Sequence, residues 1–215
     1  VAGRPVAAVP EPRHHVSYPS IPEGSMKTAN KTALLVIDVQ ESFRKRPYWQ
    51  PQEASAFIAN TQALIDHCRN RGVPVVQVFH HEPQVDPNDP FHPKSGYVRA
   101  MPELRLEADA VFHKEVHSAL YGKNADGVTL ENWLRSNGME EVLVTGIRTE
   151  QCCETTTRHA SDAGFKVQFV GDATLTFPMQ SRAGRHFSSA DIRERTELVL
   201  DGRFARVVST SEALG

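Results

Sequence analysis

Three side chains with complementary chemistry stand near the ends of segments whose composition is typical of β-strands. Asp38 lies in TALLVIDVQ, Lys114 ends AVFHK, and Cys152 follows EEVLVTGI after a short turn. Taken alone, an Asp there is commonly a cap, a Lys a solvated amine, and a Cys a small buried side chain. Brought together, they would form a nucleophile with a charge partner and a general acid/base.

The segment GIRTEQCCETTTRHASDAG (146–164) raises the question of which of two adjacent thiols reacts. The residues Thr-Glu-Gln lead into a predicted helix, so Cys152 falls near its N-terminus. Free amide groups and the positive end of the helix dipole would stabilise a thiolate there, and a nearby ammonium would add to this effect. Asp38 would then take the thiol proton and hand it to a leaving amine, while backbone amides of the turn would bind the oxyanion.

The elements that must position these side chains alternate between strand and helix. Apolar runs predict strands at 32–40, 73–80, 110–114, 140–147, 165–174 and 205–210. Helical periodicity predicts helices at 53–72, 129–138 and 188–202, and one that ends at Gly164. This alternation predicts an α/β fold, a single-domain three-layer α/β/α sandwich with a central, mainly parallel six-stranded sheet. Ligands of such folds bind beyond the carboxyl ends of the strands, where the three side chains lie.

Composition argues against several classes of partner. The 24 Lys and Arg against 26 Asp and Glu give a net charge of -2, which does not favour nucleic acid or an anionic membrane surface. No apolar run approaches the length of about 20 residues that crosses a bilayer. The three cysteines are an odd count without framework spacing, so we expect free thiols in a reducing, cytoplasmic compartment. No cofactor is predicted.

Residues 1–25 differ from the rest of the chain. They are rich in Pro, Ala, Val and Ser and lack helical or strand periodicity. Met26 has the character of a natural start, and the Gly-Ser pair before it is typical of a cloning scar. We interpret 1–25 as an N-terminal leader, tag or extended arm and 26–215 as one folded domain. A native arm that packs on a neighbouring molecule is the alternative.

Three motifs, in order, resemble those of the isochorismatase-like cysteine hydrolase superfamily, which includes nicotinamidases, N-carbamoylsarcosine amidase and ureido amidohydrolases. LLVIDVQESF resembles the first family motif, VFHKEVHSALYG the lysine motif, and VLVTGIRTEQCCETTTRHASDAGFKVQFVGDAT the long nucleophile motif. The resemblance runs from about Lys31 to Leu214. It implies that the domain at 26–215 is a hydrolase domain with a catalytic triad.

The resemblance assigns a role to each of the three side chains. It implies that Asp38 is the general acid/base and that Lys114 orients the pair and stabilises charge. Cys152 would be the nucleophile and would form a thioester that water cleaves. Cys153 falls where the family carries an apolar residue, so it would point toward the sheet as a core side chain.

The family also places a cis peptide bond just before the nucleophile turn. In this sequence that bond would join Ile147 to Arg148. The implied oxyanion hole consists of the backbone amides of Arg148 and Cys152. Arg148 itself is longer than expected there and either pairs with a substrate carboxylate or turns to solvent or a neighbouring subunit.

One region departs from the nicotinamidase pattern. Nicotinamidases carry an Asp-x-His pair after the second strand, whereas VFHHEPQVDPNDPFH has none. The region still holds side chains that suit zinc or a similar ion. They are His80, His81, Asp86, Asp89 and His92. We favour a polar loop with an active-site histidine over a metal site, which weakens the case for a nicotinamidase.

The substrate is predicted only as a class. Isochorismatases lack the nucleophilic cysteine and cleave a vinyl ether, so Cys152 points instead to a C–N bond in a small amide, ureido or carbamoyl compound. The candidate walls of the pocket are Phe43, Trp49, His81 and Tyr121. Ordinary packing is the alternative for each of them.

Two alternatives remain open at this stage. One is an isochorismatase-type or metal-assisted nicotinamidase-type hydrolase, and the other is a non-catalytic protein that uses Cys152 and Cys153 as a thiol switch. The resemblance also implies self-association as a homodimer or homotetramer.

Overall fold

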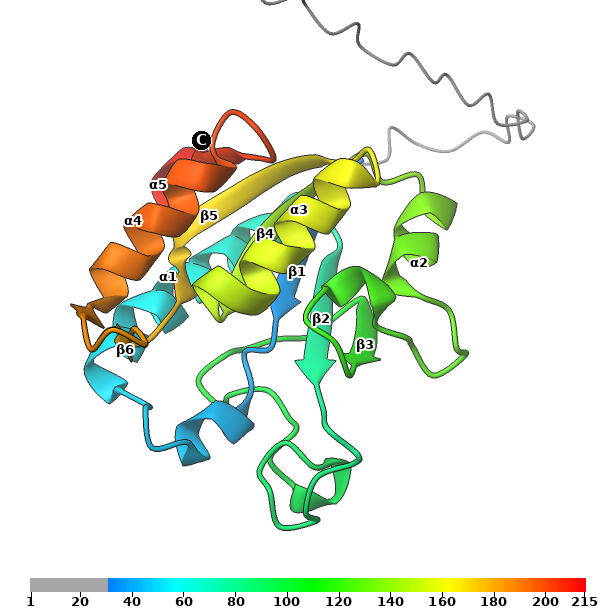
Figure 1. The fold of residues 1–215 in the computed structure, drawn as a ribbon. Coiled ribbons are helices and arrows are strands. Elements are labelled where there is room, and N and C mark those ends of the chain that lie inside the picture. Colours follow the sequence, from blue (N-terminus) through cyan, green and yellow to red (C-terminus); the bar gives the residue numbers. More distant parts are fainter. Residues whose placement is uncertain (1–30) are drawn as a thin grey trace, which may run out of the picture.

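The computed structural model describes residues 31–215 and arranges six strands in one sheet (Figure 1). The strands are β1 (Thr32–Ile37), β2 (Val75–His80), β3 (Ala110–Lys114), β4 (Glu141–Ile147), β5 (Lys166–Leu175) and β8 (Arg206–Val208). Their order is β3-β2-β1-β4-β5-β8, and every neighbouring pair is parallel. The predicted α/β fold with a six-stranded sheet is confirmed. The predicted leader or arm at 1–25 lies outside the described residues.

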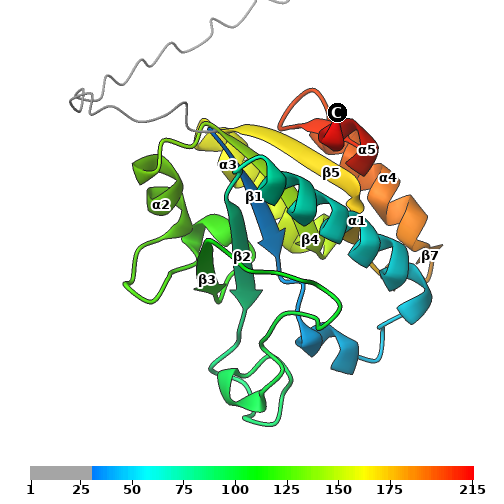
Figure 2. The same cartoon turned by 180° about the vertical axis from the view of Figure 1, so that it is seen from behind.

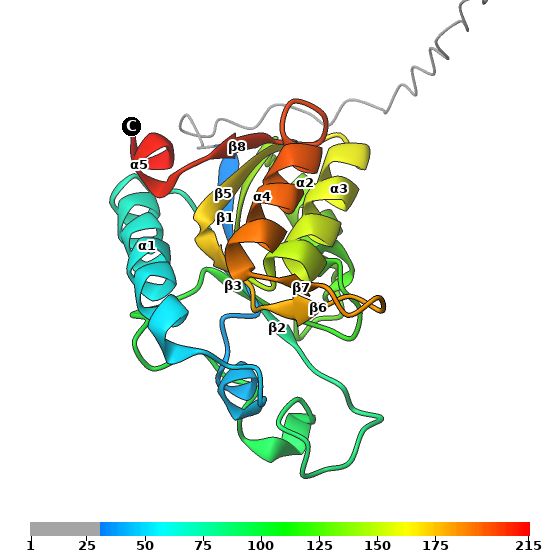
Figure 3. The same cartoon turned by 60° about the vertical axis from the view of Figure 1, so that its left-hand side comes forward.

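Helices cover both faces of the sheet. They are α1 (Pro51–Asn70), α2 (Leu130–Ser136), α3 (Glu154–Asp162), α4 (Ser189–Leu200) and α5 (Thr210–Leu214). Figure 3 shows α1 and α5 on one side and α2, α3 and α4 on the other, and in Figure 2, seen from behind, α1 lies in front of the strands. Within residues 31–215, no helix is long and apolar enough to cross a membrane.

Each face of the sheet has its own apolar core because successive side chains of a strand point to opposite faces. Leu34 and Val36 of β1 pack with Phe57 of α1. Leu35 of β1, one position away, packs instead with Leu134 of α2 on the other face. All of β1 from Ala33 to Ile37 is therefore fully buried, as expected for a central parallel strand.

The last part of the chain differs from the prediction. The strand predicted at 205–210 covers only Arg206–Val208, because the Ser209 hydroxyl and the Glu212 carboxylate form a capping box that starts α5. A small hairpin, β6 (Met179–Gln180) and β7 (His186–Phe187), was also not predicted. Short elements of this kind carry too little periodicity to be read from a sequence.

Two backbone features bring the ends of β1 and β4 close together. Asp38 directly follows β1 and has a φ of 55°, in the left-handed region that Asp tolerates better than most residues. Gly146 of β4 pairs with Ile37 and has a φ of 134°. A Cβ atom on Gly146 would lie 2.0 Å from the Ile37 carbonyl oxygen, so only glycine fits there. The turn that follows β1 therefore lies beside the turn that follows β4.

Candidate active site

Lys114 connects the other two side chains that the sequence singled out. Its Nζ atom donates to Oδ2 of Asp38 at 2.8 Å and to Sγ of Cys152 at 3.3 Å. The side chains of Lys114 and Asp38 are fully buried, and Cys152 is 6% exposed. The three come from the ends of β3 and β1 and from the turn after β4. The structure thus brings the predicted trio into direct contact.

The thiol of Cys152 is protonated in this arrangement. Burial, with the charge of Asp38 as a further cause, raises its pKa to about 12, although Lys114 acts to lower it. Cys152 also does not begin a regular α-helix, because a π-helical turn, Thr149–Cys153, precedes α3. Burial and the Asp38 carboxylate therefore outweigh the stabilisation that a helix N-terminus was expected to give the thiolate, and a proton acceptor for the thiol is needed, as predicted for Asp38.

Lys114 carries the positive charge of the pair that it forms with Asp38. Burial acts to lower the pKa of Lys114, but Asp38 and Cys152 raise it, and the net direction is upward, so the amine is an ammonium. Oδ1 of Asp38 is buried and has no hydrogen-bond partner among residues 31–215. A carboxylate with one oxygen held by an ammonium and the other free is suited to accept a proton.

Cys153 has the environment expected for it. It is fully buried and packs in the core beneath α2 and α3 together with Ala160 and Phe169. Burial raises its pKa well above the ordinary value for a thiol. Both Cys152 and Cys153 are free thiols in the structure.

The chain passes from β4 to the cysteine turn through a cis peptide bond between Ile147 and Arg148. Nε of Arg148 lies 2.9 Å from Oε1 of Glu150, and the side chain is only 12% exposed. The guanidinium lies over the rings of Tyr48 and Phe177, at 5.2 and 5.6 Å from their centres. Of the alternatives considered for Arg148, a solvent-facing side chain is wrong, because the aromatic rings and Glu150 enclose it.

Phe43 and Trp49, two of the predicted pocket walls, belong to aromatic groups. Phe43 is buried and meets Phe91 edge to face, with ring centres 4.9 Å apart. Trp49 packs on Phe177 at 5.6 Å, next to Arg148. Phe43 thus contributes to the core, and a contact of either ring with substrate stays a prediction.

The other two predicted walls lie beyond the ends of strands: His81 directly follows β2, and Tyr121 lies in the segment after β3. Nε2 of His81 is 3.7 Å from a carboxylate oxygen of Glu115. Tyr121 is 60% exposed, and its ring centre lies 4.7 Å from that of His159 on α3. Their participation in substrate binding also stays a prediction.

The His- and Asp-containing region after β2 forms a hydrogen-bonded loop. Asp89 accepts two hydrogen bonds from Arg46, at 2.9 and 3.0 Å. Nδ1 of His92 accepts a hydrogen bond from the backbone amide of Lys94. Within the described part of the chain, no group of three or more His, Cys, Asp or Glu side chains could hold a metal ion.

Two histidines also contact the trio, of which the sequence named His80 only as a candidate metal ligand or loop histidine and did not single out His117. Nδ1 of His80 lies 3.4 Å from Nζ of Lys114, and Nδ1 of His117 lies 3.8 Å from Sγ of Cys152. His117 is exposed, so it stands where the thiol meets solvent. His80 ends β2 and His117 lies in the lysine motif, so their position beyond strand ends was the available signal.

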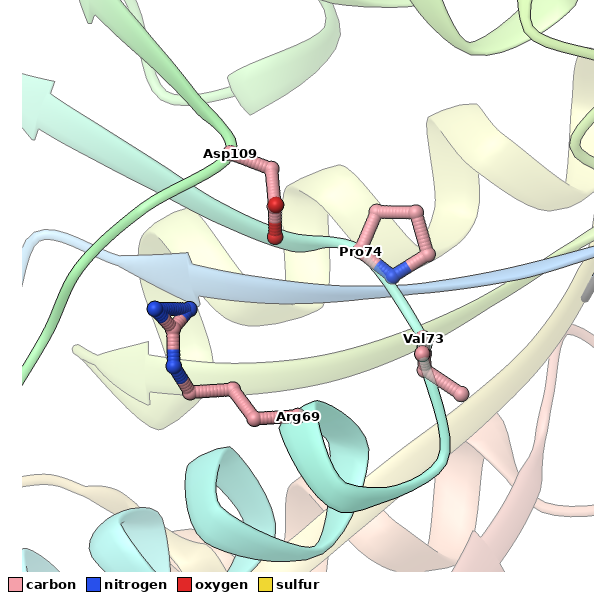
Figure 4. A pocket seen from close by; sticks show the side chains of 5 residues that line it. Arg69, Val73, Pro74 and Asp109 are labelled. Carbon is pink, nitrogen blue, oxygen red and sulfur yellow. The ribbon is translucent and has the colours of Figure 1, made fainter.

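A separate pocket of about 330 Å³ lies at the amino-terminal ends of the strands, whereas the trio lies at their carboxyl ends (Figure 4). It is lined by Arg69, Gly72, Val73, Pro74 and Asp109, at the start of β2 and just before β3. Arg69 pairs with Glu107, and Asp109 accepts a hydrogen bond from the amide of Val75 at 2.7 Å. Its charged groups are thus occupied in joining α1, β2 and β3, and it is not the site of the trio.

The chain matches known proteins over most of its length. The model of the isochorismatase domain covers residues 32–208. The isochorismatase family protein YrdC of Bacillus subtilis is 27% identical over 86% of this chain and 95% of its own. Nicotinamidase 3 of Arabidopsis thaliana is 33% identical over 67% of this chain and 73% of its own. A crystal structure of a protein from Burkholderia xenovorans LB400, described as an isochorismatase, is 32% identical and has a TM-score of 0.74. The match covers 87% of this chain and 87% of that one. The chain therefore belongs to the isochorismatase family of hydrolases.

Proposed function

We propose that this protein is a cysteine-dependent hydrolase that cleaves a C–N bond in a small amide, ureido or carbamoyl compound. The observation that carries the proposal is the contact of one buried ammonium, on Lys114, with both the Asp38 carboxylate and the Cys152 thiol. A buried ion pair of this kind is costly to desolvate and so favours a functional role. The name of the nicotinamidase relative, which acts on an amide, supports the substrate class.

The first half of the reaction forms a thioester. Because the thiol is protonated at rest, Asp38 takes its proton as Sγ attacks the carbonyl carbon. The free Oδ1 atom of Asp38 is the available acceptor. The tetrahedral intermediate collapses when the C–N bond breaks, and the same proton passes from Asp38 to the leaving nitrogen, which departs as ammonia or an amine.

The second half of the reaction restores the thiol. Asp38, again a carboxylate, removes a proton from water as the water oxygen attacks the thioester carbonyl. The C–S bond then breaks, and the proton returns to Sγ of Cys152. Lys114 stays an ammonium throughout and stabilises whichever of its two neighbours carries the negative charge.

The oxyanion of both tetrahedral intermediates needs hydrogen-bond donors. We assign this role to the backbone amides of Arg148 and Cys152, which flank the turn after the cis peptide bond. Loss of one such donor typically costs about 100- to 1,000-fold in rate. Arg148 itself pairs with Glu150, so a substrate carboxylate would have to share its guanidinium.

The thiol-switch alternative receives less support. A switch needs accessible thiols with a substantial thiolate fraction. Cys153 is fully buried, and burial raises the pKa of both cysteines. The contact of Cys152 with Lys114 also serves no purpose in a disulfide.

Ammonia release from a panel of small amides and ureido acids tests the proposal. The panel includes nicotinamide, maleamate, ureidoacrylate, biuret and N-carbamoylsarcosine, and the variants are Cys152→Ala and Cys153→Ala. We expect turnover by the parent and by Cys153→Ala and none by Cys152→Ala. Turnover by folded Cys152→Ala would refute the thioester mechanism. A panel without turnover, together with a reversible Cys152–Cys153 disulfide, would favour the switch.

A further inference from the structure

The ammonium of Lys114 has three N–H donors and three acceptors around it. Two acceptors are Asp38 and Cys152, at 2.8 and 3.3 Å. The third is Nδ1 of His80, at 3.4 Å. Since a buried N–H without a partner costs free energy, three acceptors fix the direction of all three donors. The contact with His80 therefore helps to set the orientation of the ammonium toward Asp38 and Cys152.

The ring of His80 is set in the tautomer that this contact needs. Its Nε2 atom lies 3.1 Å from Oε1 of Glu82, which accepts only if Nε2 carries the proton. Nδ1 is then unprotonated and offers its lone pair to Lys114. Burial, followed by the charge of Lys114, lowers the pKa of His80, and this keeps the ring neutral. The contacts with Glu82 and with Lys114 thus both require the neutral ring with its proton on Nε2.

The backbone of His80 is also fixed, by a side chain from the segment that follows β1 and contains Asp38. The buried amide of Gln40 accepts from the backbone N–H of His80 at 2.8 Å and donates to its carbonyl oxygen at 2.9 Å. The same amide nitrogen donates to Oγ of Ser42 at 2.8 Å. Gln40 follows Asp38 by two residues, so the acid and the histidine are held in register by one side chain.

We propose that His80 is a positioning residue of the hydrolase, which Glu82 and Gln40 hold so that its Nδ1 atom directs the Lys114 ammonium toward Asp38 and Cys152. The proposal rests on the proposed function for its kinetic consequence. The placement of the ammonium also affects the reactivity of the thiol itself. Without the third acceptor, Lys114 turns to satisfy its free N–H and stabilises the developing thiolate less well.

Two amide substitutions separate this role from a purely structural one. In His80→Asn the amide oxygen can take the place of Nδ1, whereas in His80→Gln the longer side chain brings its amide to the place of Nε2. Both variants are polar and of similar size, and His80→Leu removes the acceptor altogether. His67, near the end of α1 and remote from the trio, serves as the matched control in His67→Asn and His67→Gln.

The first measurement is kcat and KM for ammonia release. We expect His80→Asn to keep kcat within about threefold of the parent and His80→Gln and His80→Leu to lose about 10- to 100-fold, with KM nearly unchanged. The second is the rate of alkylation of Cys152 by iodoacetamide at pH 8, located by peptide mass spectrometry. The same order is expected, with Asn close to the parent and Gln and Leu slower.

Equal effects of Asn and Gln on both readouts would overturn the proposal, as would parent-like behaviour of all three variants. If His80→Leu does not fold, the comparison of Asn with Gln still decides the matter. A parent that turns over no compound refutes the proposed function, whereas the order of the alkylation rates still reports on His80. The two failures are therefore distinguishable.

Discussion

The Nζ atom of Lys114 lies 2.8 Å from Oδ2 of Asp38, and neither side chain has any exposed surface. The two residues are 76 positions apart in the sequence: Lys114 ends β3 and Asp38 directly follows β1, and β2 separates these two strands in the sheet. Each charge is tolerated in the interior because the other is present. Stability is therefore expected to depend on this pair, and under the proposed mechanism activity depends on it as well.

Lys114→Met is expected to lower the free energy of unfolding by about 3–5 kcal/mol, because it leaves the buried carboxylate of Asp38 without its partner. Urea unfolding monitored by circular dichroism measures the change. The double variant Asp38→Asn/Lys114→Met removes both charges and should regain most of the stability while it remains inactive. Equal destabilisation of the single and double variants would show that the pair contributes nothing beyond packing.

Asp38→Asn should make the thiol more reactive and the enzyme less active. Asp38 raises the pKa of Cys152 and Lys114 lowers it, so the variant keeps only the lowering influence. We expect faster alkylation of Cys152 by iodoacetamide at pH 8 and a loss of ammonia release. Slower alkylation than in the parent would contradict the assignment of Asp38 as the group that keeps the thiol protonated.

Gly146→Ala should prevent normal folding or cost more than about 4 kcal/mol, since its Cβ atom would lie 2.0 Å from the carbonyl oxygen of Ile37. Gly138→Ala is the matched control, because Gly138 has a φ of +67° but nothing within 4 Å of the added atom. That control should cost about 1–2 kcal/mol, the penalty for a left-handed backbone alone. Similar unfolding midpoints for the two variants would exclude the close approach of β4 and β1.

The buried thiol of Cys68, which lies on α1 away from the trio, should make the stability of the protein depend on pH. Burial raises its pKa from 9.0 to about 11, so the folded state holds the proton more tightly than the unfolded chain does. Its contribution is complete below pH 9 and disappears as the pH rises through 11, a full loss of about 3 kcal/mol. Cys68→Ala lacks this contribution, so its unfolding free energy should fall less between pH 8 and 11. Parallel curves for the parent and Cys68→Ala would contradict the predicted shift.

Much of the fold follows from patterns along the chain. The apolar run that contains Leu34 and Val36 predicted a strand buried on both faces, and the stripe that contains Phe57 and Leu64 predicted the helix that covers one of them. The short hairpin at β6 and β7 was missed because two-residue strands carry no measurable period.

The sequence by itself determined which residue types stand beyond the strand ends, since strand and helix periods are local properties. Asp38, Lys114 and Cys152 were identified on that ground, and they meet in the structure. Only the tertiary structure decided that the thiol is protonated, because its pKa depends on burial and on charges from other strands. It also decided that His80 is the third acceptor around the Lys114 ammonium. This contact depends on the register that places His80 of β2 beside Lys114 of β3, and register cannot be read from the residue pattern of one strand.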